Sequence, residues 1–220
     1  MKQLLGLIAL VLTLSNAHAQ DDLSSDTSNR PARGGYILSY GIGTSLTGSF
    51  EDNNHYDDYY FFSNGLSNHA KLEAFYNLSK SPDKNLWISS GVNWCSYSAN
   101  GMKDAFTDYF YQATTLQVPL NVSLVANLNE GRISMISTVG VFGRFFMDKS
   151  YLVKRDLSTN TISRQTLDGE SFGITFRAGV KIRLTGDLFY MSSVNFETDL
   201  TSNSIRNGSA TLTNGIGVNF

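Results

Sequence analysis

Strict alternation of apolar and polar residues is the feature of this sequence that most limits its fold. In TLQVPLNVSL, residues 115–124, every second residue from Leu116 to Leu124 is leucine or valine. Such alternation is typical of a β-strand whose two faces meet different surroundings. Segments of this kind recur from residue 34 to residue 220, and none of them has a helical period. The sequence therefore predicts an all-β protein.

Eight alternating segments predict eight strands. They cover residues 35–48, 67–78, 86–97, 113–126, 132–147, 170–183, 188–198 and 208–220. The spacers after the second, fourth and sixth strands are short, whereas those after the odd-numbered strands are long and polar. Short turns at one end and long loops at the other are typical of a transmembrane barrel inserted from the periplasm. A soluble eight-stranded barrel could share this pattern, so loop length alone does not decide.

The two faces of the predicted strands differ in a way that favours a membrane. In residues 170–183 one face carries Phe172, Ile174 and Phe176, and the other carries Gly173 and Thr175. The apolar faces of the strands contain no charged residue, whereas the opposite faces are rich in glycine, serine and threonine. Small side chains suit the narrow interior of an eight-stranded barrel. We therefore expect the apolar face to point outward into lipid.

Aromatic residues at the strand ends give a second indication of a membrane barrel. Outer-membrane barrels carry an aromatic girdle at each membrane interface. The two predicted girdles are Tyr36, Tyr76, Tyr190 and Phe220 at the periplasmic rim, and Trp94, Phe145, Phe172 and Phe196 at the outer rim.

Pro119 interrupts a segment that otherwise alternates strictly. Its place in the pattern predicts that it faces the lumen. Proline lacks the N–H group that a strand needs for its ladder, and a closed barrel has no edge where this loss is harmless. We therefore expect a β-bulge, a lumen side chain or a water molecule to compensate at this position.

Charged residues are also predicted inside the barrel. The inward set is Lys71, Glu73, Arg144, Arg177, Lys181, Arg183 and Glu197. These charges could line a selective pore or form an ion-paired plug. The plug is favoured because unpaired charge in a narrow lumen is costly and because eight strands leave little open space. Bulky residues predicted to point inward would fill it further: Phe75, Trp87, Phe142, Phe146, Phe189 and Met191.

The N-terminal segment is predicted to be removed on export. Residues 1–19 combine Lys2, an apolar run of about 12 residues and a small-residue cleavage site ending at Ala19, as in a signal peptide. A buried N-terminal helix is the alternative. Residues 20–33 are polar and predict a flexible periplasmic leader. Residues 34–220 then form one outer-membrane barrel domain.

Catalytic and metal-binding motifs are not found in the sequence. It contains no CxxC, HExxH, P-loop or GxSxG pattern, and Cys95 is its one cysteine. His55 lies near Asp57 and Asp58 and could form a metal or acid–base cluster, but a solvated acidic loop is favoured. His69 is predicted to face inward near the outer rim, without a Ser–Asp arrangement. We expect no catalytic residue, metal or cofactor.

Several segments resemble a known family. LQVPLNVSL, STVGVFGRFF, FGITFRAGVKI and the terminal NGIGVNF are similar to the small bacterial outer-membrane β-barrel domain family, of the OmpA/OmpX and porin-family type. The resemblance covers residues 34–220 and implies an eight-stranded antiparallel up-and-down barrel in the outer membrane. It also implies that the barrel-assembly machinery reads Phe220. The family shares no catalytic residues.

Two roles from different classes follow, with a third behind them. The favoured role is a non-enzymatic structural or interaction barrel that contacts an extracellular ligand through the predicted loops 49–66, 98–112 and 148–169. The alternatives are a small-solute porin and a lipid-modifying enzyme. Outer-membrane lipid is an expected partner. Nucleic acid is not, because the net charge is −2 and no Lys/Arg block occurs.

The final residue gives a testable prediction. If Phe220 is an assembly signal, its deletion should strongly lower the yield of assembled barrel in cells. The stability of the barrel refolded in vitro should fall much less, because burying a phenylalanine contributes only about 1.5–3 kcal/mol. The assembled fraction in cells and unfolding in lipid vesicles measure the two effects. Equal losses in both would reduce Phe220 to an ordinary girdle residue.

Overall fold

The computed structural model describes residues 33–50, 59–79, 84–128, 132–147, 150–201 and 205–220. All regular structure in these ranges is β-strand: β1 (Gly34–Phe50), β2 (Tyr59–Asn77), β3 (Lys84–Asp104), β4 (Thr107–Leu128), β5 (Ile133–Phe146), β6 (Tyr151–Asp156), β7 (Thr161–Thr166), β8 (Glu170–Thr185), β9 (Leu188–Thr201) and β10 (Ile205–Asn219). Among these residues there is no helix of the length and apolarity that crossing a membrane requires. The predicted signal peptide, and the leader up to residue 32, lie outside the described residues.

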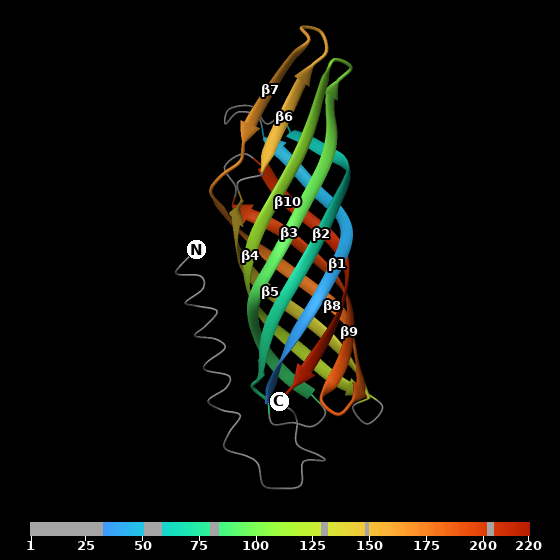
Figure 1. The fold of residues 1–220 in the computed structure, drawn as a ribbon. Coiled ribbons are helices and arrows are strands. Elements are labelled where there is room, and N and C mark those ends of the chain that lie inside the picture. The colour runs from blue at the N-terminus through green and yellow to red at the C-terminus, as the bar shows by residue number, and fades with distance from the viewer. Residues whose placement is uncertain (1–32, 51–58, 80–83, 129–131, 148–149, 202–204) are drawn as a thin grey trace.

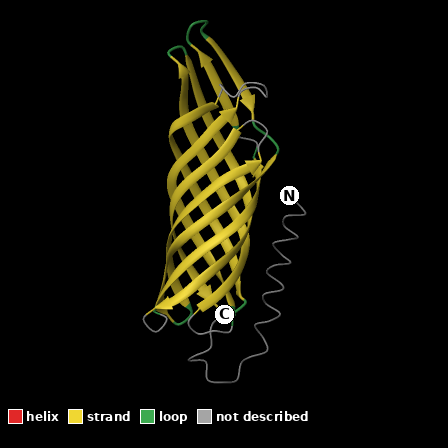
Figure 2. Ribbon diagram, turned by 180° about the vertical axis from the view of Figure 1, so that it is seen from behind, coloured by secondary structure: helices red, strands yellow, loops and turns green. Residues whose placement is uncertain are grey.

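Eight of the described strands close into an antiparallel barrel (Figures 1 and 2). Going around the barrel, the order is β1, β2, β3, β4, β5, β8, β9 and β10, and β10 pairs with β1 over its length. Each of these strands pairs with its neighbours in the chain, except that the hairpin β6–β7 is inserted between β5 and β8. The predicted eight-stranded up-and-down barrel is confirmed.

The two ends of the barrel differ. At one end, here called the terminal end, the Phe220 N–H donates to the Gly34 carbonyl at 2.9 Å, and the Arg33 N–H donates to the Phe220 carbonyl at 3.0 Å. At the other end, here called the distal end, β3 and β4 extend upward beside the hairpin β6–β7 (Figure 1). The first residues of β4, Thr107–Gln112, pair with β6, and its later residues pair with β5.

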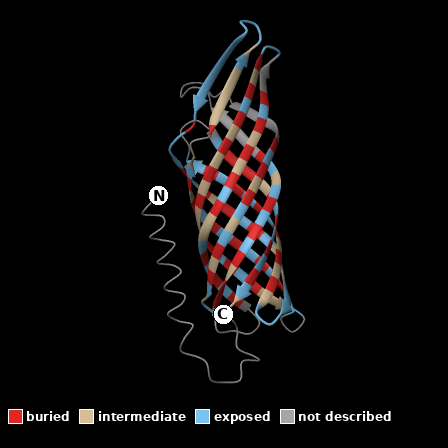
Figure 3. Cartoon of the chain, viewed as in Figure 1, coloured by how far each residue is buried: buried red, intermediate tan, exposed pale blue. Residues whose placement is uncertain are grey.

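Burial alternates along every barrel strand, as Figure 3 shows. Leu38, Leu120 and Val139 are each more than half exposed, whereas the polar residues beside them in the strands, such as Ser39 and Asn121, are buried. An apolar outer surface around a polar interior is the reverse of a soluble barrel, and only lipid stabilises it. The predicted assignment of the two faces is confirmed.

Glycines make room for the large side chains in the lumen. A Cβ atom at Gly217 would lie 2.2 Å from the ring of Phe189, and one at Gly173 would lie 2.3 Å from the ring of Phe142. Real Cβ atoms do not approach other atoms so closely. The inward glycines therefore allow aromatic rings to lie directly against the barrel backbone.

Two apolar clusters occupy opposite halves of the lumen. Toward the terminal end, the Phe75 and Trp87 rings stack at 4.1 Å, and Phe189 packs edge-on against Phe75. The members of this cluster are Ile37, Phe75, Trp87, Val125, Ile136, Phe189 and Met191. Toward the distal end the members are Cys95, Tyr97, Ala99, Tyr109, Tyr111, Ala113 and Leu167, with Phe146 and Leu152 packed against them.

The predicted long loops are largely wrong. Residues 98–112 continue β3 and β4, with a turn only at Ala105 and Phe106. The segment 148–169 contains the hairpin β6–β7, and β2 already begins at Tyr59, inside the predicted loop 49–66. Asn, Gly and Asp suggested loops here, but long cross-strand pairing and β-favouring aromatics such as Tyr109 and Tyr111 extend the strands.

Of the three compensations considered for Pro119, the β-bulge is absent. Ser90 pairs with Leu120 and Asn93 pairs with Gln117, so the register between β3 and β4 is the same on both sides. Between these two pairs the β3–β4 ladder is interrupted: Gly91 and Val92 of β3 are not paired with Val118 and Pro119 of β4. The Ser90 hydroxyl donates to the Pro119 carbonyl at 2.7 Å, which shows that this carbonyl points toward β3. A gap in the ladder with a side-chain hydrogen bond thus replaces the bulge.

The outer surface gives a testable prediction. Val141 lies in mid-strand, between Leu120 of β4 and Ile174 of β8. Val141→Arg should cost about 2–4 kcal/mol of barrel stability, because it places a charge near the bilayer midplane. Reversible unfolding in lipid vesicles measures the cost. Ile162→Arg in β7 is the matched control, because Ile162 is 70% exposed beyond the barrel and should tolerate the same change. Equal costs for the two variants would contradict the assigned membrane surface.

Candidate functional site

The described lumen contains the six charged residues that the sequence singled out for a plug. Lys71 and Glu73 lie on β2, Arg144 on β5, Arg177 and Lys181 on β8, and Glu197 on β9. Alternation along each strand turns all six side chains inward. Arg183, also predicted to point inward, is exposed and donates from Nε to the Gly186 carbonyl at 3.2 Å. It lies near the end of β8, shortly before the turn to β9.

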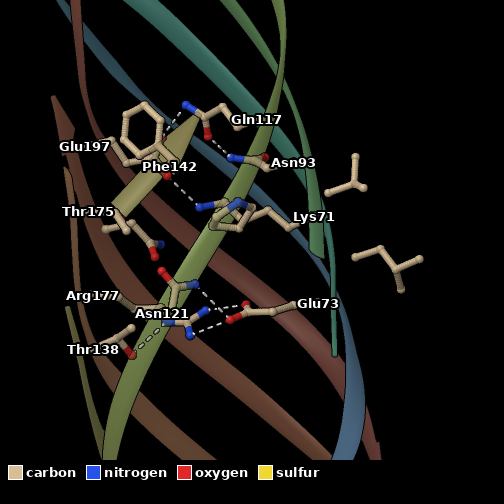
Figure 4. A pocket seen from close by; sticks show the side chains of 14 residues that line it. Lys71, Glu73, Asn93, Gln117, Asn121, Thr138, Phe142, Thr175, Arg177 and Glu197 are labelled. Carbon is tan, nitrogen blue, oxygen red and sulfur yellow. Dashed lines mark hydrogen bonds and ion pairs between the residues drawn. The ribbon is translucent and has the colours of Figure 1, made fainter. Parts of the chain in front are cut away.

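Glu73 and Arg177 form an ion pair across the lumen (Figure 4). Two guanidinium nitrogens of Arg177 donate to the two carboxylate oxygens of Glu73, at 2.7 and 3.0 Å. Ser89 and Asn121 also donate to Glu73 Oε1, at 2.6 and 3.2 Å. Arg177 Nε donates to Thr138 at 3.2 Å. Such bidentate pairing with further hydrogen bonds offsets the cost of burying both charges.

A second ion pair lies farther toward the distal end. Lys71 Nζ donates to Glu197 Oε1 at 2.9 Å, and Gln117 Nε2 donates to Glu197 Oε2 at 3.1 Å. Asn93 donates in turn to Gln117 Oε1 at 2.5 Å. Figure 4 shows these side chains converging on the lumen from separate strands. The carboxylate of Glu197 is therefore bonded on both oxygens.

A third ion pair joins Arg144 to Asp199. Arg144 Nη1 donates to Asp199 Oδ1 at 2.5 Å, and neither side chain is exposed. Arg144 also donates to the Tyr97 hydroxyl at 3.0 Å, and the Asn207 backbone N–H donates to Asp199 Oδ2 at the same distance. Sequence reasoning missed Asp199 because the predicted strand ended at residue 198. The alternation of Asn195, Glu197 and Asp199 would have revealed it.

Lys181 differs from the other cations of the lumen. Its ammonium group lies 4.7 Å from the centre of the Trp87 ring and 4.4 Å from that of Phe189. Its hydrogen-bond acceptor is Asn219 Oδ1, at 3.5 Å. Aromatic faces attract a cation, and the attraction grows where water is excluded. Lys181 therefore packs onto the aromatic cluster of the terminal half.

A small cavity separates the first two ion pairs. Its volume is about 20 Å³, and its lining includes Lys71, Glu73, Gln117, Phe142 and Arg177 (Figure 4). A water molecule needs about 10–15 Å³ measured in this way. The space therefore suits a single water between the two charged layers.

His69, Cys95 and Glu197 come together in the lumen, which the sequence did not predict. His69 and Cys95 face each other across the β2–β3 ladder, and Glu197 reaches them from β9. His69 Nδ1 lies 3.4 Å from Cys95 Sγ and 3.8 Å from Glu197 Oε2. His69 faces inward as predicted, with no exposed surface. The cluster of His55, Asp57 and Asp58 considered from the sequence lies outside the described residues.

Comparisons with known proteins give fold matches only. No protein-family model matches the chain, and no curated protein sequence matches it. Among solved structures, the outer-membrane protein OprG from Pseudomonas aeruginosa is similar at 12% identity and a TM-score of 0.49, covering 89% of this chain and 99% of that one. At this identity the likeness concerns the fold alone.

The other matched barrels have different roles. Ail, the attachment invasion locus protein of Yersinia pestis, matches at 12% identity and a TM-score of 0.38, covering 83% of this chain and 98% of Ail. The outer-membrane protease OmpT from Escherichia coli matches at 10% identity and a TM-score of 0.44, covering 91% of this chain and 99% of OmpT. Likeness at these identities concerns the fold and says nothing about function.

The Glu73–Arg177 pair gives a testable prediction. Glu73→Ala should cost about 3–5 kcal/mol, because it leaves the Arg177 charge buried without a partner. The double variant Glu73→Met with Arg177→Met should recover most of this loss, because both charges are then gone and the volume is largely kept. Urea unfolding in lipid vesicles gives both values. A double variant that is no more stable than Glu73→Ala would contradict this account of the pair.

Proposed function

We propose that this protein is a non-enzymatic outer-membrane barrel that displays a protruding sheet outside the cell as an interaction surface. The protruding sheet consists of β6, β7 and the distal parts of β3 and β4. In this proposal the barrel is an anchor, and the sheet contacts an extended segment of another protein. The observation that carries the proposal is the exposed edge strand β7, raised above a barrel with a packed interior.

The packed lumen supports the role of an anchor. Three ion pairs cross it, and apolar clusters occupy its two halves. Phe142 and Arg144, which extend from the barrel wall into the lumen, are 2% and 0% exposed. A solute-conducting pore needs a continuous open path, whereas the cavity described above has room for about one water. These features favour a closed barrel over the small-solute porin.

The burial of the reactive side chains argues against the lipid-modifying enzyme. A general acid or base must come within hydrogen-bond reach of its substrate. His69 and Cys95 have no exposed surface, and Glu73 and Glu197 are tied to Arg177 and Lys71. We therefore propose that no catalysis takes place in the described lumen.

The protruding sheet has the properties of a docking surface. All six residues of β7 are exposed, and in the described chain β7 pairs with β6 alone. An edge strand offers unpaired backbone groups, to which an extended peptide adds by β-strand addition. Ile162 of β7 is 70% exposed, and Phe106, which is 59% exposed, lies beside the turn of the hairpin, where its carbonyl accepts from the Leu157 N–H at 2.7 Å. They provide contact area beside the backbone hydrogen bonds.

The hairpin β6–β7 is held in shape before any partner arrives. Asp156 Oδ1 accepts hydrogen bonds from the backbone N–H and the hydroxyl of Ser158, at 2.8 and 2.7 Å, and from the Thr159 N–H at 3.2 Å. These bonds keep the pKa of Asp156 below its ordinary value. The Arg164 guanidinium lies 4.1 Å from the centre of the Tyr151 ring. A preformed edge lowers the entropy cost of binding.

A crosslinking experiment tests the proposal. A photoreactive phenylalanine analogue introduced at position 162 in living cells should give a discrete crosslinked protein band, because Ile162 lies beside the proposed edge. The same analogue at position 139, on the lipid face, is the matched control and should give none. Adducts of lipid alone at position 162, or no adduct, would contradict a protein partner at β7.

A second arm separates the anchor from a pore. In the full protein, the photoreactive analogue at position 106 should also give a crosslinked protein band. Replacing residues 152–165 by a short Gly-Ser turn should abolish that band and leave heat-modifiable migration unchanged. The refolded protein in planar bilayers should show no step conductance, with or without the hairpin. Regular conductance steps in the full protein would favour the porin.

A further inference from the structure

A histidine, a cysteine and a glutamate converge inside the barrel, and the role of an anchor gives no reason for the histidine and the cysteine to lie beside Glu197. His69 Nδ1 and Nε2, Cys95 Sγ and the carboxylate of Glu197 offer the ligand atoms, and one such atom from each residue lies within 4.8 Å of the others. His69 and Cys95 are unexposed, and Glu197 is 6% exposed. Imidazole, thiolate and carboxylate are the groups that bind zinc in proteins.

The separations between the donor atoms suit a tetrahedral ion. Zinc lies about 2.0–2.1 Å from nitrogen and about 2.3 Å from sulfur, so neighbouring ligands are about 3.4–3.6 Å apart at the tetrahedral angle. His69 Nδ1 is 3.4 Å from Cys95 Sγ and 3.8 Å from Glu197 Oε2. Two of the three separations therefore already match a tetrahedral site, and Cys95 Sγ and the Glu197 carboxylate lie within 4.8 Å of each other.

Neighbouring groups already orient the three donors. Ser209 Oγ lies 3.4 Å from His69 Nε2, which leaves Nδ1 facing Cys95 and Glu197. The two carboxylate oxygens of Glu197 are used differently: Oε1 accepts from Lys71, and Oε2 faces His69 and Gln117. Partners of this kind fix ligand orientation in known metal sites.

Asn93 supplies an independent indication of a missing ligand. It is 2% exposed, and its Nδ2 lies 3.3 Å from His69 Nδ1. Its Oδ1 is buried without a hydrogen-bond partner, although buried polar atoms almost always have one. The cavity of about 20 Å³ is lined by Asn93, Gln117 and Glu197. Its lining includes Glu197 but not His69 or Cys95, so it adjoins the three donors on the Glu197 side and has space for one water.

We propose that His69, Cys95 and Glu197 bind one divalent transition-metal ion of the zinc type inside the barrel. On binding, the Cys95 S–H bond breaks, a sulfur–metal bond forms and the proton leaves to solvent. The thiolate and the carboxylate both bring negative charge to the ion, although the carboxylate is shared with Lys71 through Oε1. A thiolate with an imidazole selects zinc over magnesium and calcium, which prefer oxygen ligands.

The position of the cluster determines when the ion is bound. The Glu73–Arg177 pair lies toward the terminal end, and Tyr97, Tyr111 and Arg144 lie toward the distal end, all buried. These buried layers cover the site on both sides within the part of the chain that the structure describes. We expect loading as the barrel closes, so the metal must be present during refolding.

Cobalt(II) is the probe for the test, because a cobalt–thiolate bond gives a charge-transfer absorption in the near ultraviolet. Protein without a histidine tag is refolded into detergent with Co²⁺, and in parallel Co²⁺ is added after refolding. The expected result is one cobalt ion per folded chain, with thiolate absorption. This absorption should be lost when Zn²⁺ takes the place of Co²⁺ during refolding. No thiolate absorption under either condition overturns the proposal.

Variants assign the ion to the cluster. Cys95→Ser should abolish the absorption. Loss of a group that only orients a metal ligand weakens metal binding roughly 10–100-fold. His69→Gln removes a ligand itself, so it should weaken metal retention by at least this much. His55→Ala, which changes a histidine outside the described residues, is the matched control and should bind normally. Heat-modifiable migration identifies the folded fraction of each variant, and metal is measured on that fraction alone. Folded Cys95→Ser that retains the metal overturns the proposal.

Discussion

Every backbone amide within a bilayer must find its hydrogen-bond partner in the protein, because the hydrocarbon offers none. The ladder between β1 and β10 meets this requirement by joining the first and last strands of the barrel. Pro119 is the exception, because it has no N–H to give. The β3–β4 ladder omits two pairs of positions there, and the Ser90 hydroxyl donates to the Pro119 carbonyl instead. The fold tolerates this loss because the strands on both sides keep their register.

Closure with eight strands also fixes the width of the lumen, and the width decides what can fill it. Large side chains fit only opposite small ones, as Phe189 does against Gly217. Buried carboxylates need a partner charge, and Glu73, Glu197 and Asp199 each meet a cation. The same confinement brings His69 and Cys95 to Glu197 from the opposite wall. A plugged interior and a candidate metal site thus arise from one geometric constraint.

The protruding sheet is continuous with the membrane-spanning barrel. β4 pairs with β6 over its first residues and with β5 over the rest, so one strand passes from the protruding sheet into the barrel wall. Leu167, which follows β7, is buried in the apolar cluster of the distal half. A rigid base therefore supports the exposed edge of β7. This arrangement gives the proposed interaction surface a fixed orientation relative to the membrane.

The sequence by itself determined the strands, their two faces and the inward direction of the six charged residues, because side-chain direction in a strand follows from a period of two. Sequence reasoning placed Lys71 and Glu73 in the lumen but could not say which cation each carboxylate would meet. It also missed Asp199 and the hairpin β6–β7, because strand ends depend on cross-strand pairing. Only the tertiary structure decided the partners, since the stagger of the closed barrel sets which residues of opposite walls share a level. His69, Cys95 and Glu197 meet for that reason, although 102 positions separate Cys95 from Glu197 in the chain (197 − 95).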